Sequence, residues 1–586
     1  MPAVTIALCQ FRPVKGDTEA NLDRIGRVFD TLATSPEPPD VLVFPEAILS
    51  GYFLEGGVRD HAMVAEDVFA ELAIRHTRSG APPVEVVVGF YELWRDHLHN
   101  SALWAALGGS DAGLRHVHRK IFLPTYGVFD EERFVEAGRE VRAFDTRFGR
   151  AAVLVCEDAW HSITPMIAAL DGAQVIALVA ASPARGIAPD PLQPGQPESL
   201  ARWERLARDI SAEHGIFVAL SQLVGFEGGK GFPGGSLLTG PAGDVLARAP
   251  VFEEALVQHT VDLGEIARVR AGSPLLADLQ QRLPHLLDSL KPPAEITAPI
   301  TIVPLSSSVA LPPPKVSLDI DPALTRRWLV SFLQDELQRL RGFTKAVIGL
   351  SGGVDSAVVA YLAAEALGAE NVTGVRMPYR TSHPDSLEHA RLVTEALGIR
   401  ELTVDITAAV DGYAGACGMP PTPARLGNVM ARLRMVTLFD LGAALQALPV
   451  GTGNKSERLL GYFTWHADDA PPVNPLGDLF KTQVWQLARY LGIPAAIVDK
   501  PASADLVAGQ TDESDFGISY LRADAILELL LRGHHDDAIA SADFAATEIA
   551  IVRRRLDATH WKRRLPSVAM VSQTAIGEYY LRPVDY

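Results

Sequence analysis

The sequence predicts an α/β protein, because two alternating patterns are separated by a change of composition. In the first 270 residues, apolar runs of about five residues, rich in β-branched side chains, alternate with amphipathic stretches. Residues 291–315 are rich in proline and serine and cannot continue a helix. From about residue 321 the alternation resumes. Strands that alternate with helices indicate layered α/β domains.

Each expected element follows from its local pattern. The apolar runs expected as strands of the first domain are 5–8, 41–44, 84–88, 151–155, 175–179 and 216–220. Helical spacing of apolar residues predicts helices at 20–32 and 199–213. The second pattern is typical of a doubly wound parallel sheet. Its expected order is helix 326–340, strand 346–350, helix 357–367, strand 372–376 and helix 384–397.

The chain of 586 residues is too long for one hydrophobic core. We expect one domain at residues 1–270 and a second at 321–586. The proline-rich segment 271–320 connects them, either as a free linker or as a segment laid over both domains.

Composition and charge exclude several function classes. A net charge of −18 disfavours broad binding to nucleic acid or to an anionic membrane. The three cysteines, Cys9, Cys156 and Cys417, provide neither a disulfide framework nor a zinc set, and they suit a reducing compartment. Because there is no signal-peptide pattern and no apolar run of membrane-spanning length, we expect a cytoplasmic protein without membrane or nucleic-acid partners.

A glycine-rich loop follows the expected strand at 346–350. Residues Ser351–Ser356 read Ser-Gly-Gly-Val-Asp-Ser and lead into a helix. Glycines let the backbone approach phosphate, and the free N–H groups at a helix start bind anions. No Gly-Lys-Ser/Thr closes the loop, so it is not a Walker A motif. It resembles the loop of the ATP pyrophosphatases, which split ATP to AMP and adenylate a substrate. The alternative is a tight turn without a ligand.

Motifs further along the chain narrow the choice among enzymes with this loop. They are Gly451–Glu457, Gly461–Thr464, Asn474–Leu479, Lys481–Val484, Ser503–Leu506 and Gly509–Glu513. In this order they resemble the NAD synthetases, and not the GMP synthetases, asparagine synthetases or tRNA-thiolating enzymes. Gly427–Met435 and His560–Arg563 also resemble segments of that family. The resemblance covers nearly all of residues 321–586.

The resemblance implies a site for ATP and deamido-NAD. It implies that Asn428, Glu457 and Lys562 hold deamido-NAD. Without the family resemblance, Glu457 and Lys562 would be expected to be solvated charged residues on the surface. Asp355 and Glu457 are the implied ligands of Mg²⁺, which prefers carboxylate oxygens. The residues implied to bind ATP are Gly349, Leu350, Ser351, Gly352, Gly353, Val354, Asp355, Ser356, Thr452, Lys481 and Ser503.

One segment departs from the family pattern. After Gly461–Thr464, many single-domain members carry a lysine-tyrosine pair and a glycine-rich stretch that ends in aspartate. Here the segment is Trp465–Pro472, with Trp465 in the lysine position and Pro472 in the aspartate position. We therefore expect recognition of the nicotinate ring to differ in detail.

Three reactive side chains lie at or near expected strand ends in the first domain. Glu46 follows strand 41–44, Lys120 lies in Arg119–Pro124, and Cys156 ends strand 151–155. Their order and contexts resemble the nitrilase superfamily, which implies an α-β-β-α sandwich and a Glu-Lys-Cys triad that hydrolyses amides. Cys156 without the other two would be expected to be a buried structural thiol. The resemblance covers residues 3–265, and Lys120–Gly138 resembles the amidase half of the fused NAD synthetases.

The resemblance implies that this domain hydrolyses glutamine. Glu46 would act as general base, Lys120 would stabilise the tetrahedral oxyanion, and Cys156 would form a thioester. We expect the nearby ammonium and base to raise the thiolate fraction of Cys156. The implied glutamine ligands are Tyr126, Ser182 and Arg185. Glu132 is either a supporting carboxylate or a surface residue.

Together the two halves predict a carbon–nitrogen ligase. Ammonia released from glutamine would displace AMP from an adenylated deamido-NAD, giving NAD, AMP, pyrophosphate and glutamate. The family also implies a tunnel for ammonia and a homo-oligomer, either a dimer of synthetase domains or a larger assembly such as an octamer. The alternatives are another amidotransferase with the same loop, and a binding or scaffold protein with a degenerate site.

Overall fold

The computed structural model describes residues 3–54, 57–191, 194–289, 312–419, 422–503 and 511–564. Within these ranges the chain divides into two compact units. The first contains residues up to 186 and from 196 to 289. The second contains residues from 312 to 564 together with the described residues of the segment Ile187–Gly195. This short segment therefore packs with the second unit although its neighbours in sequence belong to the first.

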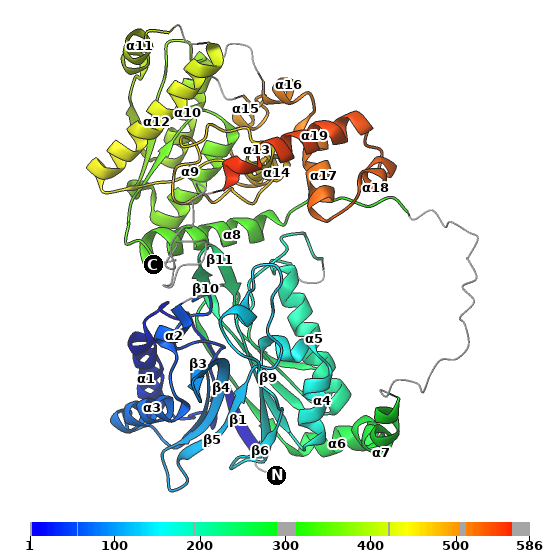
Figure 1. Ribbon diagram of the computed structural model, residues 1–586. Coiled ribbons are helices and arrows are strands. Elements are labelled where there is room, and N and C mark those ends of the chain that lie inside the picture. The colour runs from blue at the N-terminus through cyan, green and yellow to red at the C-terminus, as the bar shows by residue number, and fades with distance from the viewer. Residues whose placement is uncertain are drawn as a thin grey trace, which may run out of the picture. The chain divides into compact units, whose positions relative to one another are not determined.

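The first unit is an α-β-β-α sandwich, which confirms the expected fold class (Figure 1). One six-stranded sheet has the order β14-β1-β2-β3-β4-β5, and the other has the order β13-β12-β9-β8-β7-β6. Alternate residues such as Ile6, Val43 and Val153 point into a core shared by the two sheets. The bounds of the first sheet are β1 Ala3–Gln10, β2 Val41–Val43, β3 Val84–Trp94, β4 His97–Leu107, β5 Gly113–Arg119 and β14 Ala255–Asp262. Those of the second are β6 Ala143–Asp145, β7 Arg150–Val155, β8 Val175–Ala180, β9 Phe217–Gln222, β12 Leu237–Thr239 and β13 Val245–Arg248.

Helices cover the outer face of each sheet. The apolar stripes of α1 (Thr18–Thr34) and α3 (Ala65–Ser79) pack with the first sheet in one core cluster. Residues of α4 (Ile163–Leu170) and α5 (Glu198–His214) join the core under the second sheet. Asp17 caps α1 by accepting a hydrogen bond from Ala20 N. The apolar residues that recur at helical spacing in the sequence thus form the buried faces of these helices.

Strand β3 is longer than the expected strand at 84–88. It continues to Trp94 because Arg95 and Asp96, at φ values of 51° and 67°, form a tight turn into β4. The predicted strand ends at Val88 because Gly89 ends the run of valines, whereas in the structure Phe90 and Tyr91 continue the strand. The resulting hairpin pairs Val84–Trp94 with His97–Leu107 along its whole length.

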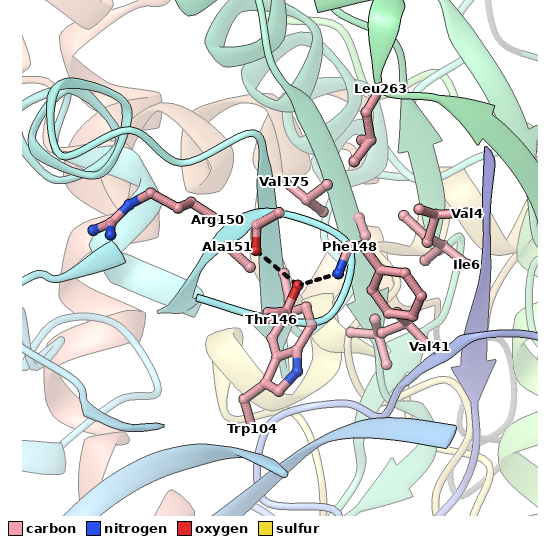
Figure 2. Close-up of a pocket in the computed structure, with 14 residues that line it drawn as sticks. Val4, Ile6, Val41, Trp104, Thr146, Phe148, Arg150, Ala151, Val175 and Leu263 are labelled. Carbon is pink, nitrogen blue, oxygen red and sulfur yellow. Dashed lines mark hydrogen bonds between the residues drawn. The ribbon is translucent and has the colours of Figure 1, made fainter. Parts of the chain in front are cut away.

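A small apolar cavity lies between the two sheets (Figure 2). Val4, Ile6 and Trp104 line it from the first sheet, and Ala151 and Val175 line it from the starts of β7 and β8. Cys156 follows the opposite end of β7. The cavity is therefore a packing feature of the core and is separate from the predicted reactive groups.

The second unit contains a parallel four-stranded sheet of order β17-β16-β15-β18. This confirms the doubly wound α/β prediction. The strands are β15 Ala346–Gly349, β16 Val372–Arg376, β17 Arg400–Thr403 and β18 Leu448–Pro449. Helices that accompany the sheet are α8 Pro322–Leu333, α9 Val354–Leu367, α10 Pro384–Leu397, α12 Pro423–Leu445 and α14 Lys481–Tyr490. The expected helix 326–340 ends early as α8 and continues as a π-helix at Gln334–Arg339.

A second core cluster gathers the later helices of this unit. It contains Leu460 of α13 (Lys455–Leu460), Phe480, and apolar residues of α17 (Tyr520–Leu531) and α19 (Ala546–Ala558). Figure 1 shows α17 and α19 at the red end of the chain. Because the starts of α13 and α14 lie beside each other, the helices of this cluster support the segments that carry Glu457 and Lys481.

The connecting segment expected at 271–320 begins as a helix, α7 (Leu275–Asp288). Residues 290–311 lie outside the described ranges. In the parts of the chain that the structure describes, no helix is both long and apolar enough to cross a membrane.

Candidate active sites

Glu46, Lys120 and Cys156 meet in the interior of the first unit. Lys120 Nζ donates to Glu46 Oε1 at 2.9 Å, and both side chains are fully buried. Glu46 Oε2 accepts a hydrogen bond from Ala181 N at 2.6 Å. Cys156, which is 6% exposed, lies close enough for the charges of Glu46 and Lys120 to act on its thiol. A base, a cation and a nucleophile thus share one buried site.

The backbone takes unusual conformations at Cys156 and directly after Glu46. Cys156 has a φ of 47°, and Ala47, next to Glu46, has a φ of 51°. Side-chain-bearing residues rarely adopt positive φ, and such strain occurs at functional sites. Gly89 of β3 passes so close to Glu46 that an added Cβ would lie 2.4 Å from Pro45 O and 2.6 Å from Glu46 Cα. A glycine is therefore required for the strand to pass beside the Glu46 turn.

A further carboxylate belongs to this site, and sequence reasoning placed it one residue away. Glu131 is 7% exposed, and its Oε1 accepts from Lys120 Nζ at 2.8 Å. Glu132, the candidate supporting carboxylate, is exposed, so that alternative was wrong. Both residues lie at a short 3₁₀ turn, Glu131–Arg133, where neither helical nor strand periodicity marks the inward side.

Two neutral side chains hold the carboxylates in place. Asn100 Nδ2 donates to Glu46 Oε1 at 2.8 Å and to Glu131 Oε1 at 3.1 Å. The hydroxyl of Tyr52 donates to Glu131 Oε1 at 2.5 Å. The Oε1 atoms of Glu46 and Glu131 thus each receive at least two hydrogen bonds, which lowers the cost of burying their charge.

The charge balance of the site keeps the Cys156 thiol protonated at rest. Burial raises the pKa of Cys156 well above its ordinary value, and Glu46 and Glu131 raise it further, whereas Lys120 lowers it. Two carboxylates outweigh one ammonium. The expected rise in thiolate fraction was therefore wrong for the free protein, and the proton must leave the thiol during the reaction. Burial lowers the pKa of Lys120, but Glu131 and Glu46 raise it more, so it remains an ammonium.

Asp158 connects the segments that carry Lys120 and Cys156. Its Oδ1 accepts from Ile121 N at 2.9 Å and from Phe122 N at 3.0 Å. Its Oδ2 accepts from Val155 N at 3.2 Å and lies 2.8 Å from His118 Nε2. Asp158 is fully buried, so it fixes the ends of β5 and β7 beside each other. His118 is thus a buried partner of the Asp158 carboxylate.

The three expected glutamine ligands lie close to the segments that carry Glu46 and Cys156. The Tyr126 hydroxyl donates to Glu157 Oε2 at 2.9 Å, and the Tyr126 ring is 59% exposed. An added Cβ on Gly127 would lie 3.0 Å from the Arg185 guanidinium, which places Arg185 beside Tyr126. Ser182 Oγ accepts from Trp203 Nε1 at 2.7 Å and follows Ala181, which contacts Glu46. Glu157 adds a carboxylate beside Tyr126 that the sequence alone did not single out.

The Ser351–Ser356 loop lies between β15 and α9 in the second unit. Gly352 has a φ of 74°, and a Cβ there would lie 2.2 Å from Ser386 O, so only glycine fits. The loop is held by its own hydroxyls: Ser356 Oγ donates to Gly353 O at 3.0 Å, and Gly353 N donates to Ser351 Oγ at 3.2 Å. The first N–H groups of α9 therefore face a preformed anion-binding turn.

Asp355, Glu457 and Lys481 come together beside this loop. Lys481 Nζ lies 2.5 Å from Asp355 Oδ2 and 3.5 Å from Glu457 Oε1, and Lys481 is 3% exposed. Asn454 Nδ2 donates to Asp355 Oδ1 at 3.0 Å. Burial raises the pKa of Glu457 to about 8; Lys481 opposes this shift, and Asp355 adds to it. Asp355 thus pairs with the Lys481 ammonium, and Glu457 holds a proton that a further cation bound beside it would displace.

The donor set fits a hard divalent cation that is shared with phosphate. Among the described residues, no three His, Cys, Asp or Glu side chains form a group able to hold a metal ion alone. Asp355 and Glu457 offer two carboxylates, which suits Mg²⁺ because it is commonly bound by one or two carboxylates plus substrate phosphates. The residues present therefore fit the expected metal in combination with ATP.

Thr452 lies on the turn after β18, which Asn474 fixes by donating to Gly453 O at 2.8 Å. Gly349 and Leu350 lead from β15 into the loop. Ser503 is described and exposed, whereas residues 504–510 of the two later motifs lie outside the described ranges.

Asn428 and Lys562 both contact the Gly461–Thr464 turn. Asn428 Oδ1 accepts from Thr464 Oγ1 at 3.1 Å, and Lys562 Nζ donates to Gly461 O and Phe463 O, each at 2.9 Å. Glu457 lies instead with Lys481, so the three expected deamido-NAD ligands fall into two groups. In the departing segment, Trp465 packs edge-on against Trp561 at 5.3 Å. An aromatic pair therefore occupies the place where the family pattern has a lysine.

Comparison with known proteins agrees with this arrangement. The carbon-nitrogen hydrolase family matches residues 5–271, and the NAD synthase family matches residues 326–566. The glutamine-dependent NAD(+) synthetase of Thermotoga maritima is 30% identical, and the match covers 100% of this chain and 99% of that protein. The NH(3)-dependent NAD(+) synthetase of Trichlorobacter lovleyi is 48% identical over 260 residues, 44% of this chain and 94% of that protein.

A solved structure is similar over the whole chain. The glutamine-dependent NAD+ synthetase of Acinetobacter baumannii, in complex with adenosine diphosphate, superposes with a TM-score of 0.69. The match covers 99% of this chain and 97% of that one, at 23% identity. At this identity the likeness concerns the fold.

Proposed function

The chain belongs to the glutamine-dependent NAD(+) synthetase family, and on this premise we propose that it converts deamido-NAD to NAD with ATP and with ammonia from glutamine. The observation that carries the proposal is the presence of two complete sets of reactive groups in one chain. One is the buried Glu46–Lys120–Cys156 group, and the other is the loop of Asp355 with Glu457 and Lys481. The first set suits amide hydrolysis, and the second suits ATP cleavage.

Glutamine hydrolysis begins with transfer of the Cys156 thiol proton to Glu46. The sulfur then attacks the carboxamide carbon, and Lys120 stabilises the oxyanion that forms on the carbonyl oxygen. Glu46 passes its proton to the departing nitrogen, which leaves as ammonia. Water activated by Glu46 cleaves the thioester and releases glutamate. Glu131 keeps Lys120 charged and in place through the 2.8 Å contact.

The residues near Cys156 suit an amino acid substrate. Arg185 supplies a cation for the α-carboxylate, and Glu157 supplies an anion for the α-ammonium, while Tyr126 and Ser182 add hydroxyl groups. The Tyr126–Glu157 hydrogen bond of 2.9 Å supports a joint role of the two side chains.

Adenylation takes place at the Ser351–Ser356 loop. The nicotinate carboxylate attacks the α-phosphorus of ATP, pyrophosphate leaves, and ammonia then displaces AMP to give the amide. The N–H groups at the start of α9 and Lys481 bind the phosphates, with Gly349–Ser356, Thr452 and Ser503 around the nucleotide. Asn428 and Lys562 hold deamido-NAD. Asp355 and Glu457 would hold Mg²⁺, which supplies charge neutralisation of the pyrophosphate.

We assign glutamine hydrolysis to residues 1–270, adenylation to residues 321–586, and a connecting role to residues 271–320. The substrates are small molecules. We further propose that the chain acts as a homo-oligomer in which the synthetase domains pair, which sedimentation of the purified protein would test.

The proposal is tested by steady-state turnover with ATP and deamido-NAD, comparing glutamine with ammonium and counting glutamate per NAD. We expect NAD, AMP and pyrophosphate in equal amounts. Replacement of deamido-NAD by nicotinate mononucleotide, xanthosine monophosphate or aspartate is expected to abolish AMP release. AMP release that prefers one of these acids would assign a different acceptor.

A further inference from the structure

A buried aspartate of α17 contacts the starts of two other helices. Asp524 is fully buried, and its Oδ1 accepts from Ser456 Oγ at 2.5 Å. Its Oδ2 accepts from Thr482 N at 3.0 Å and from Thr482 Oγ1 at 2.9 Å. Ser456 lies at the start of α13, and Thr482 at the start of α14. One carboxylate thus connects two segments that are separated in sequence.

The contact reaches the reactive groups through their immediate neighbours. Ser456 Oγ, which donates to Asp524, also accepts from Lys481 N at 2.9 Å. Ser456 precedes Glu457, and Thr482 follows Lys481. The first N–H groups of α14 have no partner within the helix, and here Ser456 and Asp524 supply it from outside. A negative charge at a helix N-terminus is also favourable.

We propose that Asp524 is a positioning residue for adenylation, which sets the spacing between the Glu457 carboxylate and the Lys481 ammonium. The inference rests on the proposed function of this site. Because Asp524 fixes the backbone at Ser456 and Thr482, it fixes the points from which Glu457 and Lys481 reach the nucleotide. The starts of α13 and α14 cannot then move apart without breaking a hydrogen bond to Asp524 or Ser456.

The surroundings of Asp524 indicate that packing alone does not require an acidic residue there. Its neighbours Ala523, Ile526 and Leu527 belong to the apolar cluster of α17. Burial raises the pKa of Asp524 to about 6, which Ser456 and Thr482 partly offset. Burying a charged group costs free energy unless hydrogen bonds compensate it. The carboxylate at this position is therefore explained by the hydrogen bonds that it accepts at the starts of α13 and α14.

The test is ammonium-dependent NAD formation by the full-length chain. Asp524→Asn keeps the shape of the side chain but replaces one acceptor oxygen with a donor. Ser456→Ala removes the hydroxyl that links Asp524 to Lys481 N. Because small displacements of catalytic groups cost about 100-fold in rate, we expect each variant to lower kcat by at least about tenfold, with a smaller change in KM for ATP. Thr482→Val, which keeps the backbone donor, is expected to have a smaller effect.

The double variant separates positioning from general destabilisation. If Asp524 and Ser456 act through one path, Asp524→Asn/Ser456→Ala loses no more kcat than the worse single variant. Asp537→Asn, on the exposed start of α18 (Asp536–Ser541), is the matched control and is expected to keep wild-type kcat.

The outcomes are distinct. Wild-type kcat in folded Asp524→Asn, or multiplicative losses in the double variant, would overturn the inference. If Asp524→Asn does not fold, Ser456→Ala decides, and wild-type kcat in that variant overturns it. Absence of NAD formation by the wild-type chain would instead contradict the proposed function.

Discussion

Lys120 Nζ lies 2.8 Å from Oε1 of Glu131, almost the same distance as from Oε1 of Glu46. The ammonium is therefore shared between two buried carboxylates, and removing the charge of Glu131 leaves Lys120 with one. We expect Glu131→Gln to lower glutamine-dependent NAD formation about 100-fold, because Lys120 loses its orientation toward the oxyanion. Ammonium-dependent formation should stay at the wild-type rate, since it does not use this site.

Glu132→Gln is the matched control. Glu132 is the exposed neighbour of Glu131, and its replacement removes the same charge without touching Lys120. We expect wild-type rates with both nitrogen donors. Equal losses in the two variants would show that overall charge, and not the contact with Lys120, matters.

Gly89 offers a test of the backbone beside Glu46. In Gly89→Ala the new methyl group meets Pro45 O at 2.4 Å and Glu46 Cα at 2.6 Å, so the Glu46 turn must move. We expect glutamine hydrolysis to fall by about 100-fold, measured as glutamate release. Gly113→Ala on β5 meets nothing within 4 Å and should keep full activity. Unchanged glutamate release by Gly89→Ala would contradict the close approach of β3 to Glu46.

The pH dependence of stability reports on Asp524. Its pKa is about 6 in the folded chain, against about 3.9 in an unfolded one. Below pH 4 both states hold the proton. Between about pH 4 and 6 the folded state binds more protons than the unfolded state, so the free energy of unfolding falls as pH rises, by about 3 kcal/mol in all.

The Asp524→Asn variant lacks this fall, because the asparagine amide does not titrate in this range. The Tm of the wild type minus that of the variant should decrease as pH rises from about 4.5 to about 6.5 and then stay constant. The hydrogen bonds that the variant loses change the Tm difference by a further amount that does not depend on pH. A Tm difference that is flat across this range would contradict a raised pKa for Asp524.

Much of the fold could be predicted from the sequence, because the spacing of apolar residues indicates which face of a helix or strand is buried. The strand at Val372–Arg376 and the helix at Pro384–Leu397 have the predicted bounds. The length of strand β3 was underestimated because Gly89 ends the run of valines on which the prediction rested. The full-length likeness to a glutamine-dependent NAD(+) synthetase confirms the family that motif order indicated.

The full set of residues at each site was harder to predict from the sequence. Glu46, Lys120 and Cys156 stand in distinctive local contexts, and the structure brings them together. Glu131 lies at a turn, where no period separates it from Glu132. Asp524 lies in α17 between Arg522 and Glu528, and only its burial and its hydrogen bonds to Ser456 and Thr482 distinguish it from a solvated aspartate. Such side chains act through tertiary contacts that a local pattern does not contain.

The central claim is that two separate reactions share one chain, with Cys156 needed for only the first. The most direct test is NAD formation by purified Cys156→Ala with each nitrogen donor. We predict that glutamine-dependent formation is lost and that ammonium-dependent formation remains at the wild-type rate. Loss of NAD formation with both donors, or its retention with glutamine, would contradict the account.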